Sequence, residues 1–224
     1  MISTTIIKSA SSLELSLYDH PSAVAVDWAK REDDPICWGV TKIDGIWYFG
    51  FRGSKSRNDW ERDFEALAIW ADDLKCHVHP GFYANGAIKT IVLTALAVIG
   101  DDDYVIFGHS LGAAEAAIAA VYCILLAKKR PLARIAWGEP RPGFSDLAQL
   151  LAEIPNYNFV NGGTVDYDRV TDVPFTLVFE WYCAGAPHLF VCEPPSPYNI
   201  DILFRWHNFV LYNAAMNKLP DEEM

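Results

Sequence analysis

Two patterns of hydrophobic and polar positions alternate along the chain. Short apolar runs rich in branched and aromatic residues predict strands at 36–40, 46–51, 104–107, 133–137 and 158–160. The dipeptide Asp44-Gly45 between the first two runs predicts a hairpin. Longer stretches with a helical period predict helices at 60–74, 86–99 and 113–129. Because short strands alternate with longer helices, we expect an α/β fold with a mostly parallel central sheet flanked by helices.

Composition supports one globular domain over residues 1–224. Of the 224 residues, 51% are apolar and 13% aromatic, which suffices to bury a substantial core and excludes a disordered chain. No linker, repeat or low-complexity tract divides the sequence. The five cysteines are widely spaced, odd in number and without a CxxC pair. We therefore expect buried thiols in a reducing compartment rather than a disulfide framework.

The charge balance narrows the range of partners. Lys and Arg number 18 against 29 Asp and Glu, a net charge of −11, which disfavours nucleic acid and anionic membrane surfaces as partners. Residues 1–8 do not combine a basic region with an apolar run, so no signal peptide is expected. The most membrane-like window, 104–127, is interrupted by Glu115 and leaves an apolar run too short to span a bilayer. We expect a cytoplasmic protein without stable membrane association, with a leaderless route of export left open.

A candidate nucleophile lies between a predicted strand and a predicted helix. Gly108-His109-Ser110-Leu111-Gly112 is a G-x-S-x-G pattern, which places a serine oxygen on a sharp strand-to-helix turn at the carboxyl end of a sheet. Glycines on both sides relieve the crowding that such a turn imposes, and the helix start offers N–H groups to a developing oxyanion. A tight turn that merely contains a serine is the alternative. The flanking strand and helix favour the nucleophile.

Several further blocks resemble the class 3 lipases, the fungal-type triacylglycerol lipases within the α/β-hydrolases. They occur in the order of that family, and they are Phe51-Arg52-Gly53-Ser54 with Trp60 and Asp63, Val78-His79-Pro80-Gly81-Phe82, Gly138-Glu139-Pro140-Arg141 and Asp168–Pro174. The resemblance implies an α/β-hydrolase fold and a serine esterase or lipase. Since the chain is short for that fold, we expect no large cap domain.

The resemblance also implies how an oxyanion would be held. The backbone N–H groups of Ser54 and Leu111 would form the oxyanion hole, and Asp63 would hold the Ser54 hydroxyl. Two preorganised donors would stabilise the charge that develops only in the tetrahedral intermediate. The alternatives are an ordinary strand-end turn for Ser54 and a solvated helix position for Asp63.

The base is expected among the histidines that follow Ser110, because the triad order in this fold is serine, acid, histidine. The histidines at 20, 77, 79 and 109 precede the serine, which leaves His188 and His207. His207 is favoured because it precedes an apolar C-terminal helix and resembles the late H-x-x-Y of the family, with a longer spacing to Tyr212. His188, at a predicted strand end, is the alternative.

The acid has three candidates in one loop, Asp166, Asp168 and Asp172. Asp168 fits the D-x-V-x-x-[LV]-P register of the family, although the approach from Val160-Asn161-Gly162 is longer here. Asp166 is the second choice. The two that are not used would belong to an acidic loop without a catalytic role.

No cofactor or metal is expected. Cys76-His77-Val78-His79 has no second pair of ligand residues elsewhere, and Val78 and His79 already belong to a lipase block. The glycine pairs follow neither a P-loop nor a dinucleotide pattern.

The segment 56–63 bears on the choice of substrate. The lipases of the family carry a short amphipathic lid here, whereas this segment has five charged residues and the single aromatic Trp60. A lid that rests on lipid needs a larger apolar face. We therefore expect an esterase that forms a covalent acyl-enzyme from short-chain or soluble acyl esters, with a small-molecule or lipid ester as substrate.

Two other classes of function remain open from the sequence. A thioesterase, acyltransferase or amidase would use the same triad. A catalytically silent hydrolase fold that serves for binding is the other alternative, and it is disfavoured because every residue type that the chemistry needs is present.

Overall fold

The computed structural model describes residues 2–19, 36–53, 67–162, 167–173, 188–191 and 207–222. These residues form a six-stranded sheet in the order β1-β2-β5-β6-β7-β8. Its strands are β1 (Trp38–Ile43), β2 (Ile46–Phe51), β5 (Tyr104–His109), β6 (Ala133–Trp137), β7 (Asn156–Asn161) and β8 (His188–Val191). β1 pairs with β2 antiparallel, and every other pairing is parallel. The predicted α/β fold with a mostly parallel sheet is confirmed.

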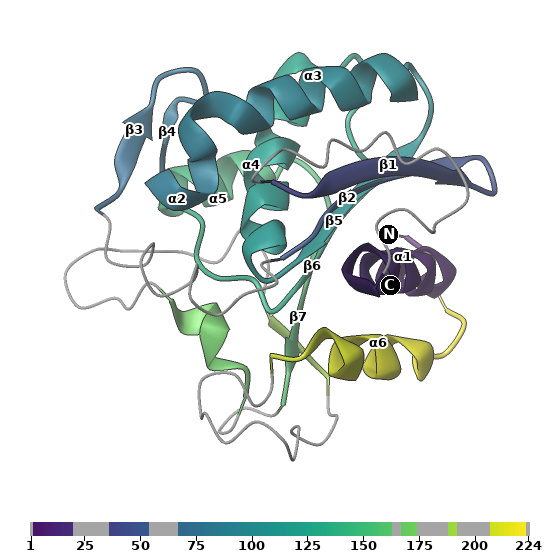
Figure 1. Ribbon diagram of the computed structural model, residues 1–224. Coiled ribbons are helices and arrows are strands. Elements are labelled where there is room, and N and C mark those ends of the chain that lie inside the picture. The colour runs from purple at the N-terminus through teal and green to yellow at the C-terminus, as the bar shows by residue number, and fades with distance from the viewer. Residues whose placement is uncertain are drawn as a thin grey trace.

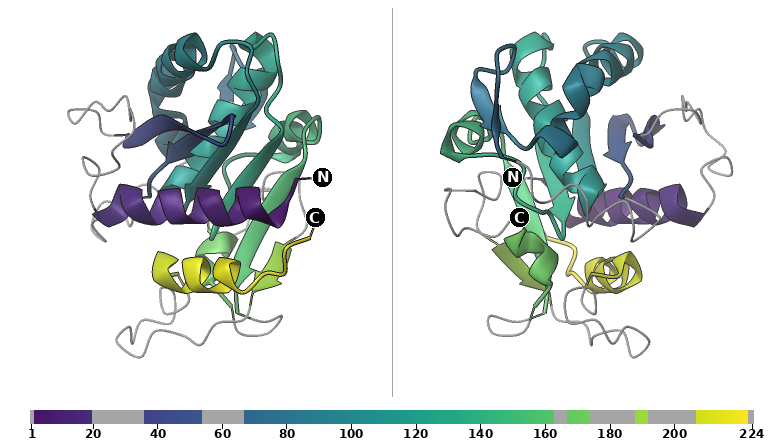
Figure 2. Two further views of the ribbon diagram at one scale, coloured as in Figure 1. Left: turned by 90° about the vertical axis from the view of Figure 1, so that its right-hand side faces the viewer. Right: turned by 60° about the vertical axis from the view of Figure 1, so that its left-hand side comes forward.

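Helices cover both faces of this sheet (Figure 1). One face carries α2 (Pro80–Tyr83), α3 (Ala87–Ile99), α4 (Leu111–Leu126) and α5 (Ser145–Leu151). The other face carries α1 (Thr4–Asp19) and α6 (Phe209–Asn217), which run side by side (Figure 2). The two chain ends meet there, because the Thr4 N–H donates to the Glu222 carbonyl at 3.0 Å.

The strands divide their side chains between two cores. Phe49 and Phe51 of β2 pack under α3 and α4, whereas Tyr48 faces α1 and α6. β5 does the same with Ile106 on one side and Phe107 on the other. Because successive strand residues point to opposite faces, a strand covered on both sides reads as a continuous apolar run. That is why the sequence pattern located these strands.

The stretch 67–74, predicted to be helical as part of 60–74, is not a helix. It forms β3 (Ile69–Ala71) and a turn, and pairs antiparallel with β4 (Cys76–Val78). Ala71 and Leu74 are buried and Ile69 and Trp70 are exposed, as the helical spacing predicted, but Leu67 of the same predicted face is exposed. Pairing with β4 satisfies the backbone of β3, so tertiary contacts override the local period. Residues 60–66 lie outside the described residues.

α1 is a long helix that the sequence analysis missed. It buries Ile7, Ala10 and Leu17 against the sheet, together with the polar Ser11 and Glu14. Buried polar residues interrupt its apolar stripe, which explains why periodicity did not show it.

The cysteines in the described residues are thiols. Cys37, Cys76 and Cys123 are free, and the latter two are buried, whereas Cys183 and Cys192 lie outside the described residues.

The run Pro80–Ile99 is long and apolar enough to cross a membrane, a test that core helices of soluble proteins also pass. The run is broken by left-handed backbone at Ala84 and Gly86, and α3 packs its apolar side into the core.

A buried ion pair connects β6 to the segment that follows it. Arg134 donates to Glu139 through Nη1 at 2.6 Å and Nη2 at 3.2 Å, and both side chains are fully buried. Asn158 of β7 donates its amide to the same carboxylate at 3.1 Å. The bidentate geometry and the added amide satisfy charges that burial would otherwise leave costly.

Glu139→Ala should lower the free energy of unfolding by about 3–5 kcal/mol, because it leaves the Arg134 charge buried without its carboxylate. Urea unfolding followed by tryptophan fluorescence measures the change. Glu153→Ala is the matched control, since its partner Arg130 is exposed and such pairs contribute about 0–1 kcal/mol. Equal losses in the two variants would contradict the role given to the buried pair.

Candidate active site

Ser110 occupies a strained turn between β5 and α4. Its backbone has φ 59° and ψ −130°, a region that residues with a Cβ rarely adopt. The turn is closely packed: a Cβ on Gly108 would collide with the Gly112 carbonyl, and one on Gly112 with the Phe51 carbonyl. Glycine is therefore required at both flanks of the serine. Leu111 is the first residue of α4, where backbone N–H groups have no intrahelical acceptor.

Asp168 and His207, 39 residues apart, are hydrogen-bonded. The distance from His207 Nδ1 to Asp168 Oδ2 is 2.6 Å, and Asp168 is fully buried. The Tyr212 hydroxyl donates to the same Oδ2 at 2.6 Å, and the Val170 N–H donates to Oδ1 at 3.0 Å. A carboxylate held by three donors keeps a fixed orientation, and it orients the imidazole in turn.

Gly138, which follows β6, lies between the serine turn and this pair. A Cβ at Gly138 would stand 2.6 Å from Asp168 Oδ2 and 2.9 Å from His207 Nδ1, so only a glycine leaves room. The Ser110 N–H donates to the carbonyl of Trp137, the residue before it, at 2.9 Å. Ser110, Asp168 and His207 therefore gather where β5, β6 and β7 end.

Aromatic packing connects His207 to the turn that carries Ser110. The His109 ring lies 4.6 Å from that of His207 and 4.9 Å from that of Phe209, centroid to centroid. Burial holds the pKa of His109 well below its ordinary value, and a charge on His207 would lower it further. His109 is consequently an uncharged ring that packs against His207.

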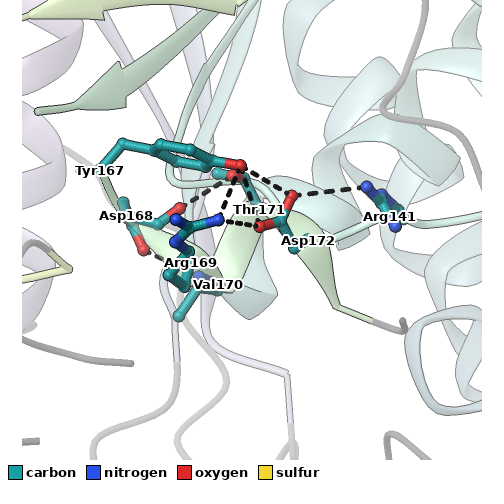
Figure 3. A network of polar contacts seen from close by, with 7 residues as sticks. All are labelled: Arg141, Tyr167, Asp168, Arg169, Val170, Thr171 and Asp172. Atoms are coloured by element: carbon teal, nitrogen blue, oxygen red, sulfur yellow. Dashed lines mark hydrogen bonds and ion pairs between the residues drawn. The ribbon is translucent and has the colours of Figure 1, made fainter. Parts of the chain in front are cut away.

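A polar network fixes the turn that carries Asp168 (Figure 3). The Tyr167 hydroxyl donates to Asp172 at 3.0 Å, and Arg169 and Arg141 contact the same carboxylate at 3.3 and 3.4 Å. Asp168 thus caps the start of η3 (Arg169–Asp172), Asp172 is its last residue, and the two carboxylates have different partners. Asp172 binds Arg141 and Arg169, whereas Asp168 is hydrogen-bonded to His207.

The sequence matches the family described as lipase (class 3) over residues 48–178. The chain belongs to the class 3 lipase family. This confirms the resemblance, and it makes the protein a serine carboxylic-ester hydrolase of a family that acts on lipid esters. Comparison with curated proteins gives no match.

Solved structures show the same fold at low sequence identity. The lipase of Rhizopus microsporus var. chinensis is 20% identical with a TM-score of 0.67, covering 86% of this chain and 75% of that chain. The triacylglycerol lipase of Penicillium expansum is 17% identical (TM-score 0.66; 84% and 79% covered). The Rhizomucor miehei lipase in its propeptide complex is 20% identical (TM-score 0.64; 84% and 68% covered).

The structure of this class 3 lipase separates some of the alternatives left by the sequence. It brings Asp168 and His207 together and engages Asp172 elsewhere. His188 begins β8, beside Asn158 of β7, and its side chain is not described. The oxyanion candidate Ser54, its partner Asp63 and the alternative acid Asp166 all lie outside the described residues.

Two contacts in this lipase were not expected from the sequence. Tyr212 entered only as an approximate spacing match, yet its hydroxyl reaches the carboxylate of Asp168. Tyr18 of α1 lies at 2.9 Å from His109 Nδ1, and nothing in the sequence pointed to that helix. Both pairings join segments far apart along the chain, so local patterns carry no signal for them.

The histidines of the C-H-x-H stretch have structural partners. His77 Nδ1 lies 2.7 Å from Asp146, and His79 accepts the Gly81 N–H as the cap of α2. Within the described ranges, no group of three or more His, Cys, Asp and Glu side chains is arranged to hold a metal ion.

Proposed function

We propose that this class 3 lipase hydrolyses acyl esters through a triad of Ser110, Asp168 and His207. The observation that carries the proposal is the 2.6 Å hydrogen bond between His207 and Asp168, at the sheet edge where the Ser110 turn lies. Nucleophilic acyl transfer needs a serine on a strained, glycine-flanked turn and an imidazole that is oriented by a buried carboxylate.

In this mechanism each group has one task. The Ser110 oxygen attacks the ester carbonyl while His207 Nε2 takes its proton and then gives it to the departing alcohol. Asp168 holds the Nδ1–H, which selects the tautomer and stabilises the imidazolium. Water then attacks the acyl-enzyme with His207 again as base, which releases the acid and restores Ser110.

The proposal assigns the oxyanion to the backbone N–H groups of Leu111 and Ser54, with Asp63 holding the Ser54 hydroxyl. It is supported by Gly53, the residue before Ser54, where a Cβ would stand 2.9 Å from the Ser110 Cβ. The strand end of β2 is therefore in contact with the nucleophile turn. Each oxyanion donor is worth about 2.7–4 kcal/mol in comparable enzymes.

Hydrolysis of p-nitrophenyl esters from acetate to laurate tests the function, with Ser110→Ala assayed beside the wild type. We expect hydrolysis that depends on Ser110. His207→Ala and His188→Ala, made separately, identify the base: only the first should abolish turnover. Wild-type protein without activity on any ester would contradict the proposal.

We further propose a preference for short or soluble acyl esters. The charged composition of 56–63 and the net charge of −11 both oppose adsorption to an anionic lipid surface. The rate should therefore rise smoothly and saturate as tributyrin concentration passes its solubility limit. A sharp rise at that limit, measured by titrating the released acid, would show interfacial activation and contradict the preference.

A further inference from the structure

The side of the nucleophile turn that faces α1 carries polar groups that the mechanism above does not use. Glu14 and Tyr18 lie one helical turn apart on α1, and Glu14 is fully buried. A buried acid without hydrogen bonds lowers stability, and neither Glu14 oxygen has a hydrogen-bond partner among the described residues. The surroundings of Glu14 and Tyr18 indicate a role that would compensate for this cost.

Tyr18 contacts both turns that the proposed oxyanion hole requires. Its hydroxyl lies 2.9 Å from His109 Nδ1, next to Ser110. The same hydroxyl occupies the position against which a Cβ on Gly53 would collide. Tyr18 therefore bridges the end of β2 and the end of β5.

Glu14 lies near the same two turns, at Gly53 and at His109. Burial raises the pKa of Glu14 well above its ordinary value, and Glu115 of α4 adds to that rise. The Arg52 guanidinium and the backbone N–H groups of His109 and Gly53 act in the opposite direction, which places the Glu14 carboxyl near both turns.

The Gly53 turn packs so closely on the His109–Ser110 turn that no other side chain fits between them. A Cβ on Gly53 would stand 2.7 Å from the His109 carbonyl and 2.9 Å from the Ser110 Cβ. The residue after Gly53 and the residue after Ser110 would supply the two oxyanion donors. The Gly53 turn, which leads into the first of these residues, rests on the His109–Ser110 turn, which leads into the second.

We propose that Glu14 and Tyr18 are positioning residues, which hold these two turns in the register that the oxyanion donors need. The inference rests on the proposed ester hydrolysis and adds α1 to the elements that determine its rate. It differs from a contribution to folding alone, because it predicts a selective loss of transition-state stabilisation.

The experiment compares Tyr18→Phe, Glu14→Ala and Glu14→Gln with the wild type on an ester and on its thionoester. Sulfur accepts hydrogen bonds weakly, so an intact oxyanion hole prefers the oxygen ester. Tyr18→Phe and Glu14→Ala should each lower kcat about tenfold, with KM changed by less than about twofold and a smaller ester-to-thionoester rate ratio. Glu14→Gln, neutral and of the same shape, should keep kcat within about threefold of the wild type.

Ser11→Ala is the matched control, because Ser11 is buried on α1 and donates to Asn213 of α6 at 2.9 Å rather than to the turns. It should leave kcat and the rate ratio unchanged even where thermal unfolding shows a loss of stability. Unchanged kcat in Tyr18→Phe and Glu14→Ala would overturn the inference, and so would a lower kcat with an unchanged rate ratio. Wild-type activity that does not depend on Ser110 would instead remove the proposed function and this inference together.

Discussion

Ser110→Ala should lower kcat/KM for ester hydrolysis by at least about 10⁴-fold, because no other group on the turn can form the acyl-enzyme. The fold should survive, since alanine removes only the hydroxyl and keeps the Cβ already present at the strained turn. Steady-state hydrolysis of p-nitrophenyl butyrate measures the loss. Near-ultraviolet circular dichroism shows that the packing is retained.

Ser145→Ala provides the control, since this serine begins α5, an element that takes no part in the proposed triad. It should hydrolyse the ester at the wild-type rate. A phosphonate ester should label the wild type and Ser145→Ala at one site and leave Ser110→Ala unlabelled. Full activity in Ser110→Ala would refute the mechanism.

Asp168→Asn should lower kcat by about 10³–10⁴-fold with little change in KM. The amide can donate to His207 Nδ1, which would place the proton on Nε2 and remove the base from the serine. The new amide would also lie against the hydroxyl of Tyr212, which in the wild type donates to the Asp168 carboxylate at 2.6 Å. Steady-state hydrolysis of p-nitrophenyl butyrate measures both parameters.

The neighbouring Asp172→Asn separates a catalytic acid from an acid that only stabilises the loop. Its carboxylate contacts Arg141, Tyr167 and Arg169 rather than His207, so its loss should cost less than about tenfold in kcat. Both variants replace a carboxylate by an amide on the same short helical turn. Equal losses in both would contradict the assignment of Asp168.

The sequence located the sheet well because its central strands are buried on both faces. Continuous apolar runs such as 104–107 and 133–137 leave few alternatives to a covered strand, and β5 and β6 were found there. The helix predicted for the stretch 67–74 was wrong because the local pattern there left an alternative. Its apolar spacing fits a helix, and only the pairing of β3 with β4 shows that it is a strand.

Local sequence patterns were enough to predict the family, the α/β fold and the candidate nucleophile. Each depends on short-range features: a strand, a glycine-flanked serine and a helix start follow one another within a few residues around Ser110. The chemistry of that turn is written in neighbouring positions, so one sequence suffices to predict it.

Which groups surround the Ser110 turn depends instead on tertiary packing. Asp168, His207 and Tyr212 meet across loops, and Glu14 and Tyr18 reach the same place from the first helix of the chain. Chain order limits such partners but does not select among them, since the choice depends on how strand ends and helices pack in space. Packing at the ends of β2, β5, β6 and β7 is what brings these distant residues together.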